Sequence, residues 1–114
     1  MTATIYHNPR CSKSRQALAL LEEKGINAEI RLYLNDPLTA PELKSLLDQL
    51  KIPAHDILRA KESEYKEAGL SKEATEAQII AAIINTPKLL ERPIVVTDKG
   101  ARIGRPTEAI LDVL

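Results

Sequence analysis

Hydrophobic and polar positions in the first third of the chain follow a strand, helix, strand order. Residues 3–6 form a short apolar run, and apolar side chains then recur at helical spacing up to about Lys24, just before Gly25. From Ala28 to Tyr33 apolar and polar residues alternate, which is typical of a half-buried strand. The pattern predicts a βαβ unit with parallel strands and a right-handed crossover.

The middle of the chain, at about 38–90, has the pattern of a helical segment. Thr39 and Thr75 each begin a capping box, and a stripe of Leu or Ile at helical spacing follows each of them. These stripes predict core packing and give no reason to infer a cofactor site. Two shorter helical pieces are predicted at 55–58 and 62–68.

The last third returns to strands. The run Ile94-Val95-Val96-Thr97, a turn at 98–100 and the residues 101–103 predict an antiparallel hairpin, followed by a helix from Pro106 or Thr107 that turns Ala109, Ile110 and Val113 inward. The element order predicts an α/β fold with a mixed sheet of four strands. With 114 residues, of which 44% are hydrophobic, one domain over 1–114 with a helical insertion at about 38–90 is expected.

Charge and composition narrow the classes of function. Sixteen basic and sixteen acidic residues cancel, which argues against a general nucleic-acid or membrane surface. No apolar run approaches the length of a bilayer span, and no signal-peptide pattern is seen at the N-terminus. A single cysteine cannot form an internal disulfide, so a reducing compartment suits a working thiol. We therefore expect a cytoplasmic protein, and we take it to be a monomer.

Candidate chemistry centres on the only cysteine, Cys11, at the junction of the first strand and the first helix. Unpaired backbone N–H groups and the positive end of the helix dipole favour the thiolate there. A lone cysteine is more often a half-buried structural residue. The neighbours His7, Arg10, Lys13 and Arg15, with no acid among them, favour a nucleophile in a positive field instead.

Three arginines lie at predicted boundaries of elements: Arg59, Arg92 and Arg105. An arginine fork matches a tetrahedral oxyanion, although a solvated or capping side chain is the commoner role of any one arginine. Pro93, directly before a strand, is either a strand-edge proline or a cis-proline, and the residues leave both open.

Two known cysteine motifs do not fit. A tyrosine-phosphatase loop needs arginine as the sixth residue after the cysteine, where this chain has Ala17. A thioredoxin Cys-x-x-Cys motif needs a second cysteine where this chain has Ser14. His7 and His55 are too few and too isolated for a zinc site, and His55 is expected at the surface.

Several short motifs follow one another along the chain: His7-Asn8-Pro9-x-Cys11, Ser14-Arg15, Leu58-Arg59, Arg92-Pro93-Ile94-Val95-Val96 and Arg105-Pro106. In this order and at these separations they closely resemble the motifs of the glutaredoxin-dependent arsenate reductases, and the resemblance covers essentially the whole chain.

The resemblance implies a thioredoxin-like fold with a helical insertion and assigns roles to single residues. It implies that Cys11 is the nucleophile, that His7 helps to lower the thiol pKa, and that Pro93 is the cis-proline of the fold. It implies an oxyanion site made by Arg59, Arg92 and Arg105, with Ser14 and Arg15 as further donors.

Electron counting indicates an external partner. Reduction of arsenate to arsenite takes two electrons, which thiols supply by joining two sulfurs, and this chain has one. The prediction is an arsenate reductase that uses glutathione as co-substrate and glutaredoxin as partner, with no metal or bound cofactor. Two alternatives are a thioredoxin-like regulatory module that binds RNA polymerase, which Ser14 disfavours, and a general thiol transferase acting on glutathione mixed disulfides.

Overall fold

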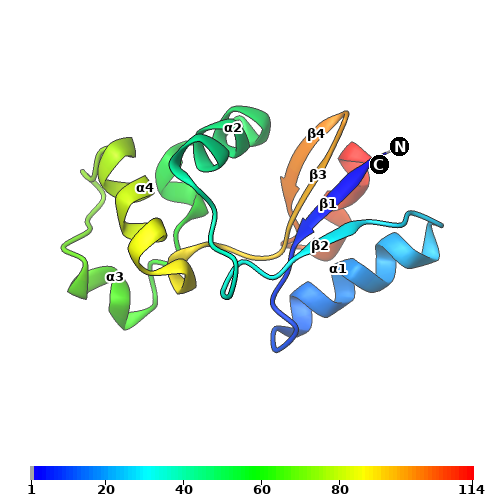
Figure 1. Cartoon of the computed structure of the whole chain (residues 1–114), viewed down its shortest axis with the longest axis horizontal. Coiled ribbons are helices and arrows are strands. Elements are labelled where there is room, and N and C mark those ends of the chain that lie inside the picture. The colour runs from blue at the N-terminus through cyan, green and yellow to red at the C-terminus, as the bar shows by residue number, and fades with distance from the viewer. Residues whose placement is uncertain (1) are drawn as a thin grey trace. The chain divides into compact units, whose positions relative to one another are not determined.

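The computed structural model describes residues 2–114, which form two compact units. One unit comprises residues 2–36 together with Arg92–Leu114, and the other is Pro37–Glu91. Figure 1 labels the α-helices and the strands of both units, and each unit is described by itself. The second unit spans the segment assigned above to a helical insertion; that the chain is one domain stays a prediction.

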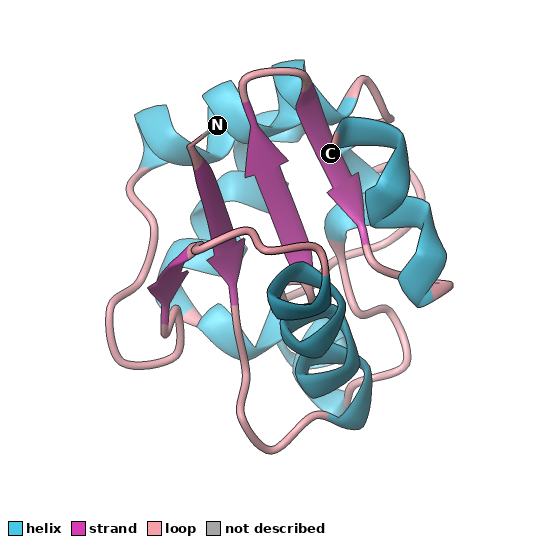
Figure 2. Ribbon diagram, turned by 90° about the vertical axis from the view of Figure 1, so that its right-hand side faces the viewer, coloured by secondary structure: helices cyan, strands magenta, loops and turns pink. Residues whose placement is uncertain are grey.

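The first unit contains a mixed sheet of four strands, seen in Figure 2. The strands are β1 (Ala3–Tyr6), β2 (Glu29–Arg31), β3 (Ile94–Thr97) and β4 (Gly100–Ile103). Their order in the sheet is β2-β1-β3-β4, with β1 parallel to β2, and with β3 antiparallel to both β1 and β4. The predicted α/β class and the mixed sheet are thereby confirmed.

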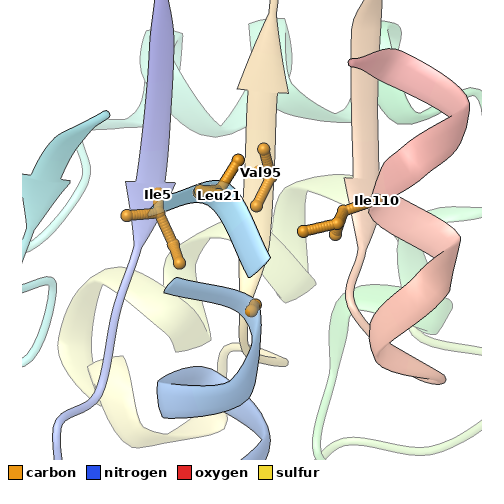
Figure 3. Close-up of a cluster of buried hydrophobic side chains, with 5 residues drawn as sticks. Ile5, Leu21, Val95 and Ile110 are labelled. Atoms are coloured by element: carbon orange, nitrogen blue, oxygen red, sulfur yellow. The ribbon is translucent and has the colours of Figure 1, made fainter. Parts of the chain in front are cut away.

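A hydrophobic cluster joins this sheet to two helices, α1 (Ser12–Glu23) and the 3₁₀ helix η3 (Thr107–Val113). The cluster consists of five fully buried side chains from β1, α1, β3 and η3: Ile5, Ala17, Leu21, Val95 and Ile110. Figure 3 draws these side chains and labels all of them except Ala17. Burying one such large aliphatic side chain stabilises the fold by roughly 1.5–3 kcal/mol. The cluster therefore fixes α1, and with it the start of α1, against β1 and β3.

Helix α1 ends at Gly25 as the sequence predicts. Gly25 has a φ of 73°, a conformation in which a side chain is unfavourable. Its N–H donates to the carbonyl of Glu22, and the N–H of Ile26 donates to that of Leu21, both at 2.9 Å. This Schellman pattern satisfies the last carbonyl groups of the helix.

The register of the sheet brings four chain segments to the same end of the strands. Tyr6 pairs with Arg31 on one side and with Ile94 on the other, and Ile94 also pairs with Ile103. The segments that follow β1, β2 and β4, and the one that precedes β3, therefore all lie at the end of the sheet where β1 and β2 have their carboxyl ends. Cys11, Arg92 and Arg105 all belong to these segments.

Two expectations for this unit are wrong in detail. The strand expected from 28 to 33 is only Glu29–Arg31, and Ile30 is 48% exposed, because β2 is an edge strand. The C-terminal helix is a 3₁₀ helix, which buries Ile110 and Val113 but leaves Ala109 half-buried. The tighter 3₁₀ turn changes which side chains face inward.

The second unit is helical, as predicted. It contains α2 (Ala40–Leu50), η1 (Ala54–Ile57), α3 (Ser63–Glu67), α4 (Glu76–Asn85) and η2 (Pro87–Leu89), and α2 packs against α4. Both predicted capping boxes are confirmed, since Thr39 and Thr75 cap α2 and α4. His55 is half-buried rather than at the surface, because its Nε2 lies 2.7 Å from the hydroxyl of Tyr65. Among residues 2–114 no helix is both long and apolar enough to cross a membrane.

Candidate functional site

Cys11 is the N-cap residue of α1, and its side chain is half-buried. Its backbone is extended, with φ −93° and ψ 122°, so the chain turns from the loop after β1 into the helix at this residue. The N–H of Cys11 donates to the carbonyl of Asn8 (3.0 Å), and the carbonyl of Cys11 accepts from Arg15 (3.0 Å). The sulfur is therefore held at the positive end of the helix dipole.

The pKa of the Cys11 thiol lies below its ordinary value. Burial of the sulfur raises this pKa, but the backbone N–H groups of Ser14 and Lys13 and the positive charges of Arg92 and Arg105 lower it by more. The sulfur makes no capping hydrogen bond of standard geometry, so these N–H groups act at longer range on a large, diffuse acceptor. The thiolate is favoured by the helix start and by two guanidinium groups together.

Arg105 is the arginine whose contact with the sulfur is direct. Its Nη2 lies 3.7 Å from Cys11 Sγ, and its Nε donates to the carbonyl of Arg92 at 2.9 Å. The side chain of one arginine is thus held by the backbone of the other. Arg105 is exposed and Arg92 is half-buried, so the two guanidinium groups lie beside the sulfur at the rim of the sheet edge.

The backbone around the two arginines is tightly packed. The Arg92–Pro93 and Arg105–Pro106 peptide bonds are both cis. Of the two alternatives that the sequence left open for Pro93, the structure therefore has the cis-proline, and Pro106 is a second one that was not predicted. The N–H of Gly104 donates to the carbonyl of Pro93 (2.9 Å). A Cβ atom on Gly104 would lie 2.8 Å from Pro93 Cγ, which is closer than van der Waals contact allows. The absence of a side chain at 104 lets the two segments approach.

His7 and Ser14 form a buried pair under the loop that carries Cys11. His7 Nδ1 lies 2.7 Å from Ser14 Oγ, and the same hydroxyl accepts the N–H of Asn8 at 3.0 Å. Burial, and next the charge of Arg15, lower the pKa of His7, so the imidazole is neutral at pH 7. Neutral His7 adds no positive charge beside the sulfur, and its contact with the loop passes through Ser14.

Arg15 completes the loop from the exposed side. Its Nη1 donates to the carbonyl of Pro9 at 2.8 Å, while the backbone N–H of His7 donates to Arg31 on β2 at 2.9 Å. These bonds fix the loop at both ends. The roles of Ser14 and Arg15 as donors to a bound anion stay predictions.

Arg59 belongs to the second unit and is described there. Its Nη1 donates to the carbonyl of Lys88 (3.3 Å), and its Nη2 forms an ion pair with Glu62. The second carboxylate oxygen of Glu62 lies 3.4 Å from Lys88 Nζ, and Glu64 lies 3.3 Å from the same ammonium group. The structure therefore brings together Cys11, Arg92 and Arg105 within one unit, while a place for Arg59 at that site stays a prediction.

Two features near these residues were not predicted from the sequence. Glu62 stands three positions after Arg59, a spacing that predicts an ion pair on one turn of chain, and this signal was readable. A cavity of about 300 Å³, lined by residues 7–10 and by Leu32, Leu34 and Asn35, has no such signal in the sequence, because only the folded sheet brings these two segments together. Within residues 2–114 no three His, Cys, Asp or Glu side chains gather as metal ligands would.

Comparison with known proteins finds similar proteins over nearly the whole chain. The model of the ArsC family matches residues 6–113. The protein named arsenate reductase from Neisseria meningitidis serogroup A is 47% identical over 112 residues, which cover 96% of each chain. The uncharacterized protein YfgD of Escherichia coli K12 is 48% identical, over 96% of this chain and 94% of that protein.

A solved structure extends the likeness to three dimensions. The arsenate reductase from Vibrio cholerae superimposes with a TM-score of 0.96 at 45% identity, covering 100% of this chain and 98% of the other. The thioredoxin-like fold and the resemblance to arsenate reductases are confirmed at the level of the family. With the family model covering nearly all residues and relatives this similar, the chain belongs to the ArsC family.

Proposed function

We propose that this protein reduces arsenate to arsenite, with Cys11 as the nucleophile and with glutathione and glutaredoxin as the source of electrons. One observation carries the proposal: a half-buried sulfur with a lowered pKa at a helix start, with the guanidinium group of Arg105 3.7 Å away. A thiolate beside fixed cationic donors suits attack on the central atom of an oxyanion, since the donors neutralise charge on the oxygens.

The first step joins the substrate to the protein. The Cys11 thiolate forms an S–As bond, one As–O bond breaks, and the oxygen leaves as water after taking up protons. Arsenic remains in the +5 state in this step. Arg92 and Arg105 hold the remaining oxygens in this proposal, and Arg59, Ser14 and Arg15 are the further donors that it includes.

Two external thiols complete the reaction. The thiol of glutathione forms a second S–As bond, and a second oxygen leaves as water. A thiol of glutaredoxin then attacks the glutathione sulfur, so that a disulfide forms and the S–As electron pair stays on arsenic, which becomes As(III). Water cleaves the remaining bond to Cys11, releasing arsenite and the thiol. The two thiols that form the disulfide thus supply the two electrons that arsenic gains.

His7 enters the proposal as a residue that acts on the thiol pKa through Ser14 and the loop, since its Nδ1 contacts that hydroxyl. Pro93 shapes the backbone next to Arg92. The proposal needs no resident metal or organic cofactor. Because glutathione is kept reduced in the cytoplasm, we place the protein there, and we take it to act as a monomer.

The test is production of arsenite by the purified protein with arsenate, glutathione and glutaredoxin. Cys11→Ser should abolish it, whereas Arg92→Ala should weaken it through loss of a charge-assisted contact of roughly 1.5–3 kcal/mol. Full activity of Cys11→Ser would end the proposal. Turnover of a glutathione mixed disulfide, with no turnover of arsenate, would replace it by the thiol-transferase function.

A further inference from the structure

A groove adjoins the Cys11 loop on the side away from Arg92 and Arg105. It is the cavity of about 300 Å³ between residues 7–10, which precede Cys11, and residues 32–35, which follow β2. Leu32 and Leu34 contribute apolar surface to it and are 39% and 42% exposed. Its volume is at the lower end of that of small-ligand sites. No step of the oxyanion chemistry above uses it.

The strand order places this groove opposite the oxyanion side of the loop. In the order β2-β1-β3-β4, the loop of Cys11 follows the interior strand β1. Arg92 precedes β3 and Arg105 follows β4, on one side of that loop, while residues 32–35 follow β2 on the other. An oxyanion held by the arginines therefore leaves the β2 side of the loop open to a second reactant. Ligands commonly bind beyond the carboxyl ends of parallel strands, and β1 and β2 form such a pair.

The charge around the groove selects the kind of reactant. Arg10 lines it and is exposed, and residues 7–15 contain no acid. The first acid after the groove, Asp36, is paired with Arg31 at 2.9 Å. The surface thus combines apolar side chains with one exposed guanidinium group. It complements a small anionic molecule that also has an uncharged part, as an anionic peptide thiol does.

The turn that lines the groove is preformed. The backbone N–H of Arg10 donates to Asn8 Oδ1, and that of Cys11 donates to the Asn8 carbonyl, both at 3.0 Å. A preformed turn binds a ligand without the entropic cost of ordering a loop. The last residue of the turn that lines the groove, Arg10, directly precedes Cys11 in the sequence.

We infer that this groove is the binding site of the anionic peptide thiol that forms the second S–As bond. The inference rests on the proposed function for the reaction step and on the groove itself for binding. In that step the thiol gives up its proton, sulfur bonds to the arsenic held on Cys11, and one oxygen leaves as water. The two substrates thus approach Cys11 from opposite sides, the oxyanion from β3 and β4 and the thiol from β2.

The kinetic test places a negative charge in the groove. Leu34→Glu should raise the KM for glutathione roughly fivefold to tenfold, through lost apolar contact and charge repulsion, and leave the KM for arsenate unchanged. Leu111→Glu is the matched control, since Leu111 is 41% exposed but lies on η3. An equal glutathione KM in the two variants, or a rise in the arsenate KM alone, would overturn the inference.

A binding test separates this inference from the proposed function. S-methylglutathione keeps the charges of glutathione but cannot form an S–As bond, so it reports binding without reaction. In a titration of the wild-type protein followed by amide NMR, shifts should concentrate at residues 7, 8, 10 and 32–35 and spare 107–113. Such shifts without arsenate turnover would uphold the groove and refute the arsenate function. Arsenate turnover with shifts elsewhere, or with none at saturating ligand, would refute the groove alone.

Discussion

Removal of the Arg105 guanidinium group is the most direct perturbation of the Cys11 thiol, the proposed nucleophile. In Arg105→Ala the charge 3.7 Å from Cys11 Sγ disappears, and so does the donor to the Arg92 carbonyl. At the dielectric of water a unit charge at this distance is worth about 1 kcal/mol. A charge-assisted contact with a substrate oxygen adds roughly 1.5–3 kcal/mol.

Because Arg105 is exposed, water screens both contributions. We therefore expect about 2–3 kcal/mol in total, which corresponds to a loss of roughly 30- to 150-fold in kcat/KM for arsenate. The pKa of Cys11 should rise in the variant, because a neighbouring positive charge that lowers it is gone. The pH profile of alkylation by iodoacetamide should accordingly move to higher pH.

Arg102→Ala is the control for a general change of charge. Arg102 lies on β4 in the same unit, and its Nε is 3.5 Å from Asp112 rather than beside the sulfur. It should change neither the alkylation profile nor kcat/KM by more than a small factor. If Arg105→Ala and Arg102→Ala gave the same alkylation profile, the reasoning about the guanidinium and the thiolate would be refuted.

Three further predictions concern residues around the site. Gly104→Ala should destabilise the protein by roughly 1–3 kcal/mol in urea unfolding, because its Cβ would overlap Pro93; an unchanged midpoint would contradict the close packing. Glu62→Gln should cost at most about 1 kcal/mol, since its ion pair with Arg59 is partly exposed, and a larger loss in the same assay would show a role beyond pairing. The folded-state pKa of His7 lies below 6.5, so the stability that neutral His7 provides is complete above pH 6.5 and declines as the pH falls from there through the folded-state pKa. The difference between the unfolding free energies at pH 7.5 and pH 5.5 should therefore be smaller in His7→Asn than in the wild-type protein. The same difference in both proteins would exclude His7 as the cause of the pH dependence.

The helix starts and the sheet could be predicted because local chemistry determines them. Capping boxes at Thr39 and Thr75 and the stop at Gly25 depend on side chains within a few residues, and each is found where the sequence indicates. The burial of β2 could not be predicted, since alternation looks the same in an edge strand as in an interior one. Ile30 is exposed because of where the strand lies in the sheet, and only long-range pairing decides that.

In the site, too, the features that depend on nearby residues could be predicted, and those that depend on distant parts of the chain could not. Cys11 at a strand-to-helix junction was recognisable, because the largest of the effects that lower its pKa comes from the helix start, which the sequence already indicates. The contact of Arg105 with the sulfur joins residues 94 positions apart, and no local pattern encodes its distance. The groove beside residues 7–10 is likewise formed by two segments that only the folded sheet brings together.

The position of Cys11 as the N-cap of α1 favours a reactive thiol at the expense of the stability of the helix. Serine, threonine, aspartate and asparagine are the residues that stabilise such a helix start, typically by about 1 kcal/mol over a side chain that makes no cap bond, and Cys11 makes none. Cys11→Ser, which should be catalytically dead, should therefore withstand more denaturant than the wild-type protein. Selection for stability alone would favour serine at this position, so a cysteine here is the residue expected if the proposed nucleophile outweighs the lost cap.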